Sequence, residues 1–334
     1  MPYVYKWISY HETQHSNIPL FQYPNTLNME TIINQIIHGI MLGVMYSLVA
    51  VGFTLFFGVL NLIQFSHGEI FMVGAFLGLI IINGLSMVLG IQNPVLLLLA
   101  AFTVSSILTG LISILFGRIT IRPIMNAPPI IALLTTLAAG ITIRYTVMAF
   151  YPSGSEPQRF PALLPDWQTE VGGVQLRFDS LFILLAGVLL IVCTYLFINK
   201  TKMGIAMRAV AQDRETAAMM GVNINRVIDI TFVVAGVLAA CAGIFNGLYY
   251  REIIFDMGAL YGVVGFSAAV IGGLGNIFGA IVGGFLFALL ASFTSAFIPG
   301  GSAYRFVVAF TFLIVFLVIM PKGILGFRKG KREA

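Results

Sequence analysis

The chain has 334 residues, of which 59% are hydrophobic and only 9% are charged, whereas soluble domains carry about 25% charged residues. So few charges exclude a soluble enzyme, because they cannot cover a water-exposed surface, and so much apolar sequence excludes intrinsic disorder. The formal net charge of +5 comes without a basic stripe interleaved with aromatic residues, so it predicts basic cytoplasmic loops and contact with membrane lipid rather than with nucleic acid.

The first segment, residues 1–28, is polar and aromatic. It has no charged region followed by an apolar one, so it does not resemble a secretory signal. We treat it as a polar N-terminal extension of unknown role and place the membrane domain at 29–321.

Nine apolar runs follow this extension, and a helix that spans a bilayer needs roughly 20 mostly apolar residues. The runs lie at 31–57, 69–83, 94–116, 128–150, 179–199, 227–249, 259–274, 277–298 and 304–320. Two of them are short, and the first is long enough to be tilted or broken. The sequence therefore predicts an all-α, polytopic helical membrane protein with eight to ten membrane segments, some of them short or discontinuous.

A polar stretch, 61–69, joins the first two runs. An ionised Glu at mid-membrane costs on the order of 3 kcal/mol, so Glu69 must lie in a water-filled cavity, form an internal pair, or sit at the interface. One interpretation is a pathway or gate element with unwound backbone. The other, compatible with it, is a cytoplasmic turn in which Ser66 caps the next helix and Glu69 takes the third position of that helix, as in a capping box. The candidate pathway or gate residues are Asn61, Gln64, His67, Gly68 and Glu69.

Arg144 is a charged residue inside the run 128–150. We expect its side chain to reach the outer membrane interface, in preference to a role in substrate contact. Asn246 and Asn276 are weaker candidates for lining a cavity, and hydrogen bonding between helices is the expected role of both.

Loop charges predict the orientation, because basic loops face the cytoplasm. The loop 200–226, the short loop after residue 116 and the tail 322–334 are basic, whereas the loop 151–178 carries both signs. We therefore expect 151–178 to be external, and 200–226 and the basic tail to be cytoplasmic.

The cytoplasmic loop contains a segment, 202–221, with high helix propensity. Gly221 is typical of a helix end. Ala217 and Ala218 are small enough to permit close approach by a partner. A helix that docks a partner and a solvated helix anchored at the lipid headgroups are equally compatible with this pattern.

Several kinds of chemistry are missing from the sequence. No G-x-x-x-x-G-K-[ST] motif occurs, so we expect no ATP binding through a P-loop. His67 and Glu69 have too few neighbouring ligands for a metal site. The glycine-rich stretch from Gly272 to Gly279 lacks a P-loop lysine and predicts close helix packing. We therefore expect no enzyme activity, no cofactor and no metal.

Four motifs, in the same order, resemble the permease family of ATP-binding-cassette importers for branched-chain amino acids, specifically the shorter of its two permease subunits. They are the opening helix at 39–48, the polar stretch 61–69, the loop 204–221 continuing into 225–228, and the closing segment 320–326. The polar stretch resembles the family's Asn-Phe-Ala-His-Gly-Glu signature, from which Gln64 and Ser66 depart. The likeness runs from about Met29 to the tail.

The resemblance implies a permease subunit that pairs with a second related permease. Two cytoplasmic ATPase subunits would dock on its loop helix, and a periplasmic or extracellular binding protein would deliver leucine, isoleucine or valine. The chain would lie in the cell (inner) membrane with a cytoplasmic C-terminus. The residues to which the docking role is carried over are Arg208, Asp213, Glu215, Ala217, Ala218 and Gly221.

Two alternatives stay open at this point. The same fold could carry urea or another amino acid. The chain could also be a stand-alone secondary transporter or channel, which needs intramembrane coupling carboxylates, and Glu69 is a thin basis for that. The sequence also leaves open whether the second permease is a copy of this chain or a different protein.

Overall fold

The computed structural model describes residues 29–125, 127–165, 167–171, 174–298 and 301–326. Within them, eight helices are long and apolar enough to cross a membrane, and a ninth, shorter helix is also apolar. The predicted all-α, polytopic membrane protein is thereby confirmed. The extension 1–28 and the tail from residue 327 lie outside the described residues.

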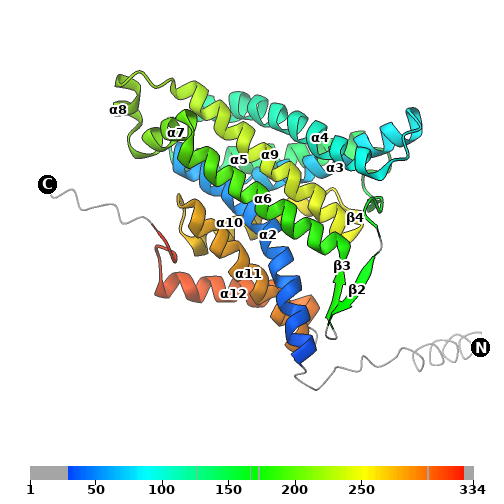
Figure 1. Ribbon diagram of the computed structural model, residues 1–334. Helices are drawn as coiled ribbons and strands as arrows, with labels where there is room; N and C mark the ends of the chain where they lie inside the picture. Colours follow the sequence, from blue (N-terminus) through cyan, green and yellow to red (C-terminus); the bar gives the residue numbers. More distant parts are fainter. Residues whose placement is uncertain (1–28, 126, 166, 172–173, 299–300, 327–334) are drawn as a thin grey trace, which may run out of the picture.

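The long helices pack side by side as one bundle (Figure 1). Their bounds are α2 Met29–Leu60, α3 His67–Val88, α4 Pro94–Phe116, α5 Pro129–Phe150, α6 Phe178–Lys200, α9 Ile224–Tyr250, α11 Ile277–Phe297 and α12 Gly301–Ile319. The ninth apolar helix is α10, Met257–Gly272, which has only 16 residues. This short helix agrees with the expectation that some membrane segments are short.

The smaller elements gather at the two ends of the bundle (Figure 1). At the first end lie the π-helical turn η1 Gly117–Ile121, the 3-10 turn η2 Arg122–Ile124, and the helices α7 Lys202–Gln212 and α8 Arg214–Met219. At the other end lie the strands β1 Gln158–Arg159, β2 Gln168–Val171, β3 Val174–Arg177 and β4 Glu252–Ile253. The antiparallel pairs β1–β4 and β2–β3 were not predicted from the sequence.

The centre of the bundle is α2, which packs against α9, α10 and α11. Its side chains Val44, Leu48 and Phe56 are fully buried. Close approach to α11 depends on small residues: a Cβ added at Gly43 would meet the ring of Phe285. By contrast, α5 and α12 are mostly exposed within this single chain although they are apolar, so they must be covered by lipid or by another protein.

The helices α10 and α11 approach each other through backbone contacts. A Cβ added at Gly272 would meet the carbonyl of Gly279, and one added at Gly283 would meet the carbonyl of Ala268. The close helix packing predicted for this glycine-rich stretch is therefore confirmed. The end of the described chain also lies against α10, where the Ile324 amide donates to the Ile271 carbonyl.

The polar stretch between α2 and α3 lies partly inside the bundle. Asn61 adopts a left-handed conformation with φ 56° and follows the last residue of α2, a conformation that Asn tolerates better than most residues. Ser66 then occupies the position before α3, but its backbone is helical and its side chain makes no capping hydrogen bond. The predicted capping box is therefore wrong, and the carboxylate of Glu69 is free to bond elsewhere.

Gly68 is expected to be intolerant of a side chain, because the first turn of α3 contacts the backbone of α10. A Cβ at Gly68 would meet the carbonyl of Gly258 and the Cα of Gly262. Gly68→Ala should lower the free energy of unfolding by about 1–3 kcal/mol, the usual cost of overpacking a tight contact. Gly84→Ala is the matched control in the same helix, since a Cβ there meets nothing within 4 Å. Equal stability of the two variants in mixed detergent micelles would contradict this packing.

Candidate functional site

Glu69 and Arg144 form an ion pair between α3 and α5. The guanidinium Nε and one terminal nitrogen both donate to Oε1 of Glu69, the Nε at 3.1 Å. The side chain of Glu69 is only 4% exposed and that of Arg144 21% exposed. Arg144 therefore has a partner within the chain, and its expected position at the outer interface stays a prediction. Of the three environments considered for Glu69, the internal pair is the one found.

The ion pair borders a cavity of about 100 Å³ between α3, α5 and α10. Apart from the pair and Thr136, its lining is apolar or small. Gly140 of α5 makes room for the carboxylate, since a Cβ there would lie 3.3 Å from the Cγ of Glu69. The lining residues are Phe65, Glu69, Thr136, Leu137, Gly140, Ile141, Arg144, Ala259, Gly262 and Val263.

The other candidate pathway residues lie apart from this cavity lining. Asn61 is exposed beside the end of α2, and Gly68 lies against α10. Gln64 is buried and donates from its side-chain nitrogen to Oγ of Ser66 at 3.3 Å. His67 is fully buried between the rings of Phe53 and Phe56, at centroid distances of 5.1 and 5.3 Å. Among the five candidates, Glu69 alone lines the cavity.

The two asparagines make contacts within the bundle. Asn246 of α9 donates to the hydroxyl of Tyr261 of α10, which is the helix-to-helix hydrogen bond expected of it. Asn276 caps α11 by accepting from the Gly279 amide at 3.1 Å, and its side-chain nitrogen donates to the Leu325 carbonyl at 2.9 Å. Neither residue lines the cavity.

The loop between α6 and α9 forms two short helices instead of the single helix expected from its propensity. The backbone of Asp213 is extended, which ends α7, and its carboxylate accepts from the amides of Glu215 and Thr216 at the start of α8. At the end of α8, Gly221 has φ 84°. Its amide and that of Val222 bond back to Ala218 and Ala217, the pattern of a Schellman motif. The helix end predicted at Gly221 is confirmed.

Helix α7 packs tightly against the end of α6. Gly204 lies against the backbone of Ile198, so that an added Cβ would meet the Ile198 carbonyl. Met207 and Val210 are buried on the same helix. These contacts fix α7 to the membrane bundle, whereas α8 projects from the bundle at the upper left of Figure 1.

The six residues predicted to couple to a partner lie on or beside these two helices. Ala217 is buried within the chain, and the other five are exposed: Arg208, Asp213, Glu215, Ala218 and Gly221. Arg208 bonds to the side chain and carbonyl of Asn199 at the end of α6. The carboxylate of Asp213 is used to cap α8, so its role includes building this helix.

Sequence reasoning missed the two side chains most exposed at the end of α8. Met219 and Met220 are each 80% exposed, an unusual position for apolar side chains next to a polar helix. Their adjacency at the predicted helix end was the available signal. The reasoning also missed Asp229 of α9, which binds Arg118 at 2.7 Å and Arg122 at 2.6 Å. No local pattern connects residues so distant in sequence.

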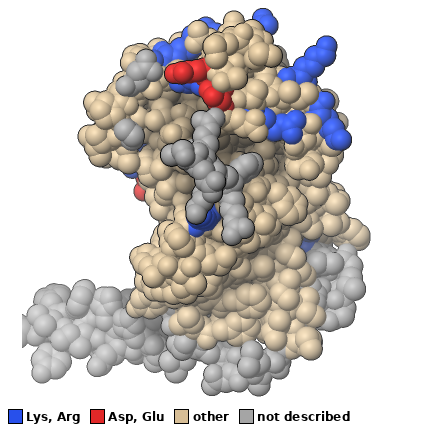
Figure 2. All heavy atoms as spheres, turned by 90° about the vertical axis from the view of Figure 1, so that its left-hand side faces the viewer, with Lys and Arg blue, Asp and Glu red and all other residues tan. Residues whose placement is uncertain are grey.

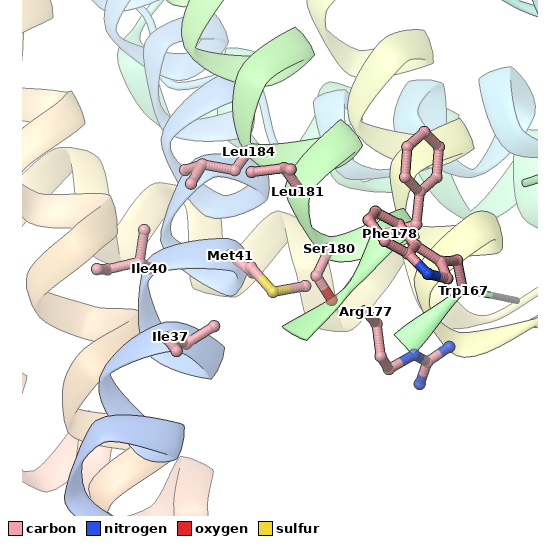
Figure 3. A pocket seen from close by; sticks show the side chains of 9 residues that line it. All are labelled: Ile37, Ile40, Met41, Trp167, Arg177, Phe178, Ser180, Leu181 and Leu184. Atoms are coloured by element: carbon pink, nitrogen blue, oxygen red, sulfur yellow. The ribbon is translucent and has the colours of Figure 1, made fainter. Parts of the chain in front are cut away.

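A second cavity lies near the other end of the bundle, between α2, α6 and the β2–β3 hairpin (Figure 3). It has a volume of about 330 Å³ and is almost wholly apolar. Figure 3 shows Ile37 and Ile40 of α2 on one side, with Trp167 and Phe178 on the other. Arg177 at its edge pairs with Asp179 at 2.6 Å.

Comparison with known proteins identifies relatives along nearly the whole chain. The model of the family described as branched-chain amino acid transport system, permease component, matches residues 35–319. The high-affinity branched-chain amino acid transport system permease protein BraD of Pseudomonas aeruginosa is 34% identical over 298 residues, covering 88% of this chain and 95% of that protein. The corresponding protein LivH of Escherichia coli is 34% identical over 301 residues, with the same coverage.

More distant similarities were also found. The xylose/arabinose import permease protein XylH of Sulfolobus acidocaldarius is 27% identical over 224 residues, covering 64% of this chain and 58% of that protein. Among solved structures, PsaBC from Streptococcus pneumoniae in complex with Fab matches with a TM-score of 0.46 and 15% identity, covering 88% of this chain and 94% of that chain.

Proposed function

This chain belongs to the family of permease components of branched-chain amino acid transport systems, and from that premise we propose that it carries leucine, isoleucine and valine into the cell as one membrane subunit of an ATP-driven importer. The family match over residues 35–319 is the observation that carries this proposal. ATP hydrolysis is assigned to two partner ATPases, and substrate delivery to an external binding protein.

The distribution of charge supports an orientation with α7 and α8 in the cytoplasm. Figure 2 shows Lys and Arg side chains gathered on the upper part of the face at the α7–α8 end. Exposed basic residues at this end are Lys200, Lys202, Arg208, Arg226 and Arg118. Since basic residues concentrate on the cytoplasmic side of membrane proteins, the β2–β3 hairpin is assigned to the outside.

We assign ATPase docking to α8, the projecting helix at the cytoplasmic end. Its exposed surface combines the carboxylate of Glu215 with the apolar side chains of Met219 and Met220. An apolar centre with a charged edge is the usual composition of a protein interface. Because α7 is fixed to α6 by backbone packing at Gly204, the two short helices can transmit a displacement to the bundle.

A continuous chain of contacts supports the route from α8 to the cavity. Helix α9 begins just after α8, and its Asp229 binds Arg118 and Arg122 in the segment after α4. The next helix along the chain is α5, which carries Arg144. Closure of the ATPases would move α5 relative to α3 through this route, provided that the ATPases bind the outward- and inward-open states differently.

The open side of the cavity supports a position for the second permease. Leu137 and Ile141 of α5 and Val263 of α10 are 40, 49 and 44% exposed at its rim. Exposing an ion pair to lipid within the membrane is costly, so this face must meet protein or water. We therefore assign the α5–α10 face to the contact with the second permease, with the pathway between the two subunits.

Glu215→Arg in the full complex tests the docking assignment. Reversing an exposed interface charge should weaken ATPase association and lower ATP-driven leucine uptake by proteoliposomes at least about 10-fold, because like-charge contacts at an interface cost several kcal/mol. Arg159→Glu, on the assigned external side, is the control and should leave ATPase association unchanged. Unchanged uptake with Glu215→Arg would remove this residue from the interface, and wild-type uptake of urea but not leucine would overturn the assigned cargo.

A further inference from the structure

The Glu69–Arg144 pair leaves binding capacity unused on both of its members. Oε1 of Glu69 accepts both bonds from Arg144, whereas Oε2 is buried and has no hydrogen-bond partner among the residues that the structure describes. A carboxylate oxygen buried without a partner is costly, so it indicates a ligand or a functional constraint. On Arg144, the second terminal nitrogen bonds to none of the described residues, and the side chain is part-exposed beside the cavity.

The carboxylate of Glu69 lies between the first turns of two helices. Glu69 lies in the first turn of α3, and its Oε2 lies beside Gly258 in the first turn of α10. The positive ends of two helix dipoles therefore stabilise this carboxylate. Asp256, just before α10, interacts electrostatically with both members of the pair.

We propose that Glu69 and Arg144 together bind the main-chain ammonium and carboxylate of the transported amino acid. Oε2 of Glu69 accepts from the ammonium, and the unused N–H groups of Arg144 donate to the carboxylate. This assignment rests on the proposed amino-acid import and adds the substrate-binding residues to it. It differs from a purely structural ion pair, which needs neither the unpartnered oxygen nor the cavity.

The rest of the cavity suits an aliphatic side chain. Leu137, Ile141 and Val263 offer an apolar wall, and Phe65 lies on the same cavity. A site with few polar groups that fix orientation and an apolar remainder is typical of small-molecule recognition. Glu69 and Arg144, which we call the clamp, hold the ammonium and carboxylate that leucine, isoleucine and valine share. The apolar wall accepts the side chains in which these amino acids differ.

In the present structure α10 covers the unpartnered oxygen. Gly258 lies over Oε2, and Gly262 lies against Gly68, so the contact between α10 and α3 at these two positions is made by backbone. A displacement of α10 away from α3 uncovers the oxygen and enlarges the cavity. The structure therefore corresponds to a closed state of this site, and binding requires an open one.

Leucine binding to the complete permease–ATPase complex in nanodiscs tests the clamp. Binding of radiolabelled leucine is measured in the absence of the external binding protein, once without nucleotide and once with ATP trapped in the ATPases. Competitors are 3-methylbutylamine, which lacks the carboxylate, and 4-methylpentanoate, which lacks the ammonium. Each should compete at least about 10-fold more weakly than leucine, since the loss of a hydrogen bond to a charged group lowers the affinity by about this factor. Equal competition by either compound, or no leucine binding to the wild type in either nucleotide state, would overturn the proposal.

Two variants separate a clamp from a structural pair. Glu69→Gln should weaken leucine binding about 10- to 100-fold. Arg177→Gln, which lies outside the cavity beside Glu69, is the control and should keep wild-type affinity. The exchange E69R/R144E restores opposite charges and should recover thermal stability but not leucine binding, because the polarity of the site is reversed. Recovery of both would show that the pair is only structural. If the wild type imports leucine while E69Q keeps its affinity, the clamp alone fails; if the wild type does not import leucine, the proposed function fails.

Discussion

Arg144→Gln is expected to lower the free energy of unfolding by about 3–5 kcal/mol, because it leaves the carboxylate of Glu69 buried without its counter-charge. The side chain of Glu69 is 4% exposed, and Arg144 supplies both of its hydrogen bonds. The measurement is unfolding by sodium dodecyl sulfate in mixed micelles, followed by circular dichroism. This is the largest stability effect that we expect from a single substitution in the chain.

The double variant E69Q/R144Q completes this experiment. Because it removes both charges together, it should be more stable than Arg144→Gln alone. Arg177→Gln serves as the control, since Arg177 is 45% exposed and the buried carboxylate of its partner Asp179 also binds Arg251 at 3.3 Å; loss of Arg177 should cost at most about 1 kcal/mol. If Arg144→Gln proves as stable as Arg177→Gln, the buried ion pair is not a determinant of the fold.

Replacing both Met219 and Met220 by Asp should abolish stable association with the ATPases. The two side chains are each 80% exposed in the isolated chain, so the substitution costs the folded chain little. Burying a methionine at an interface contributes about 1.5–3 kcal/mol, and a charge in its place adds a desolvation cost. We therefore expect at least about a 100-fold loss of ATPase affinity. Co-purification with the ATPases and leucine uptake are the measurements.

A matched pair of exposed apolar residues provides the control. Met87 and Val88 are the last two residues of α3, which ends on the side of the bundle away from α8 (Figure 1), and each is 81% exposed. Their replacement by Asp should leave the ATPases bound, because that end is assigned to the outside. An equal loss of ATPases in both double variants would place the docking surface elsewhere or reveal misfolding of both.

The membrane helices were predictable because the signal for them is local. Nine apolar runs correspond to the nine apolar helices, and Gly221 ends α8 where its conformational freedom is needed. A run of apolar residues long enough to span a bilayer has few other stable structures, since every backbone group must be hydrogen-bonded within the segment. The two small sheets, whose strands lie in the loop 151–178 and at 252–253, have no comparable signal in the sequence.

The candidate site was predictable only in part, because it depends on contacts between distant segments. Glu69 was singled out because an ionised carboxylate is energetically costly inside a membrane. Its partner Arg144 was assigned to the interface, since the sequence does not reveal that α3 and α5 are neighbours. The capping motif at Ser66 failed for the same reason: the carboxylate bonds to Arg144 rather than to its own helix. The division of the cytoplasmic loop at Asp213 had a local signal, because Asp is a preferred N-cap residue whose carboxylate accepts from the amides of the next helix.

We propose that this permease moves amino acids only when ATPases act on its cytoplasmic helices. The most direct measurement is leucine uptake by proteoliposomes that contain the whole complex and the binding protein, compared with proteoliposomes that lack the ATPases. We expect leucine accumulation that requires ATP hydrolysis and persists when a protonophore collapses the proton gradient. Uptake that continues without the ATPases, or that disappears with the proton gradient while ATP hydrolysis continues, would contradict it.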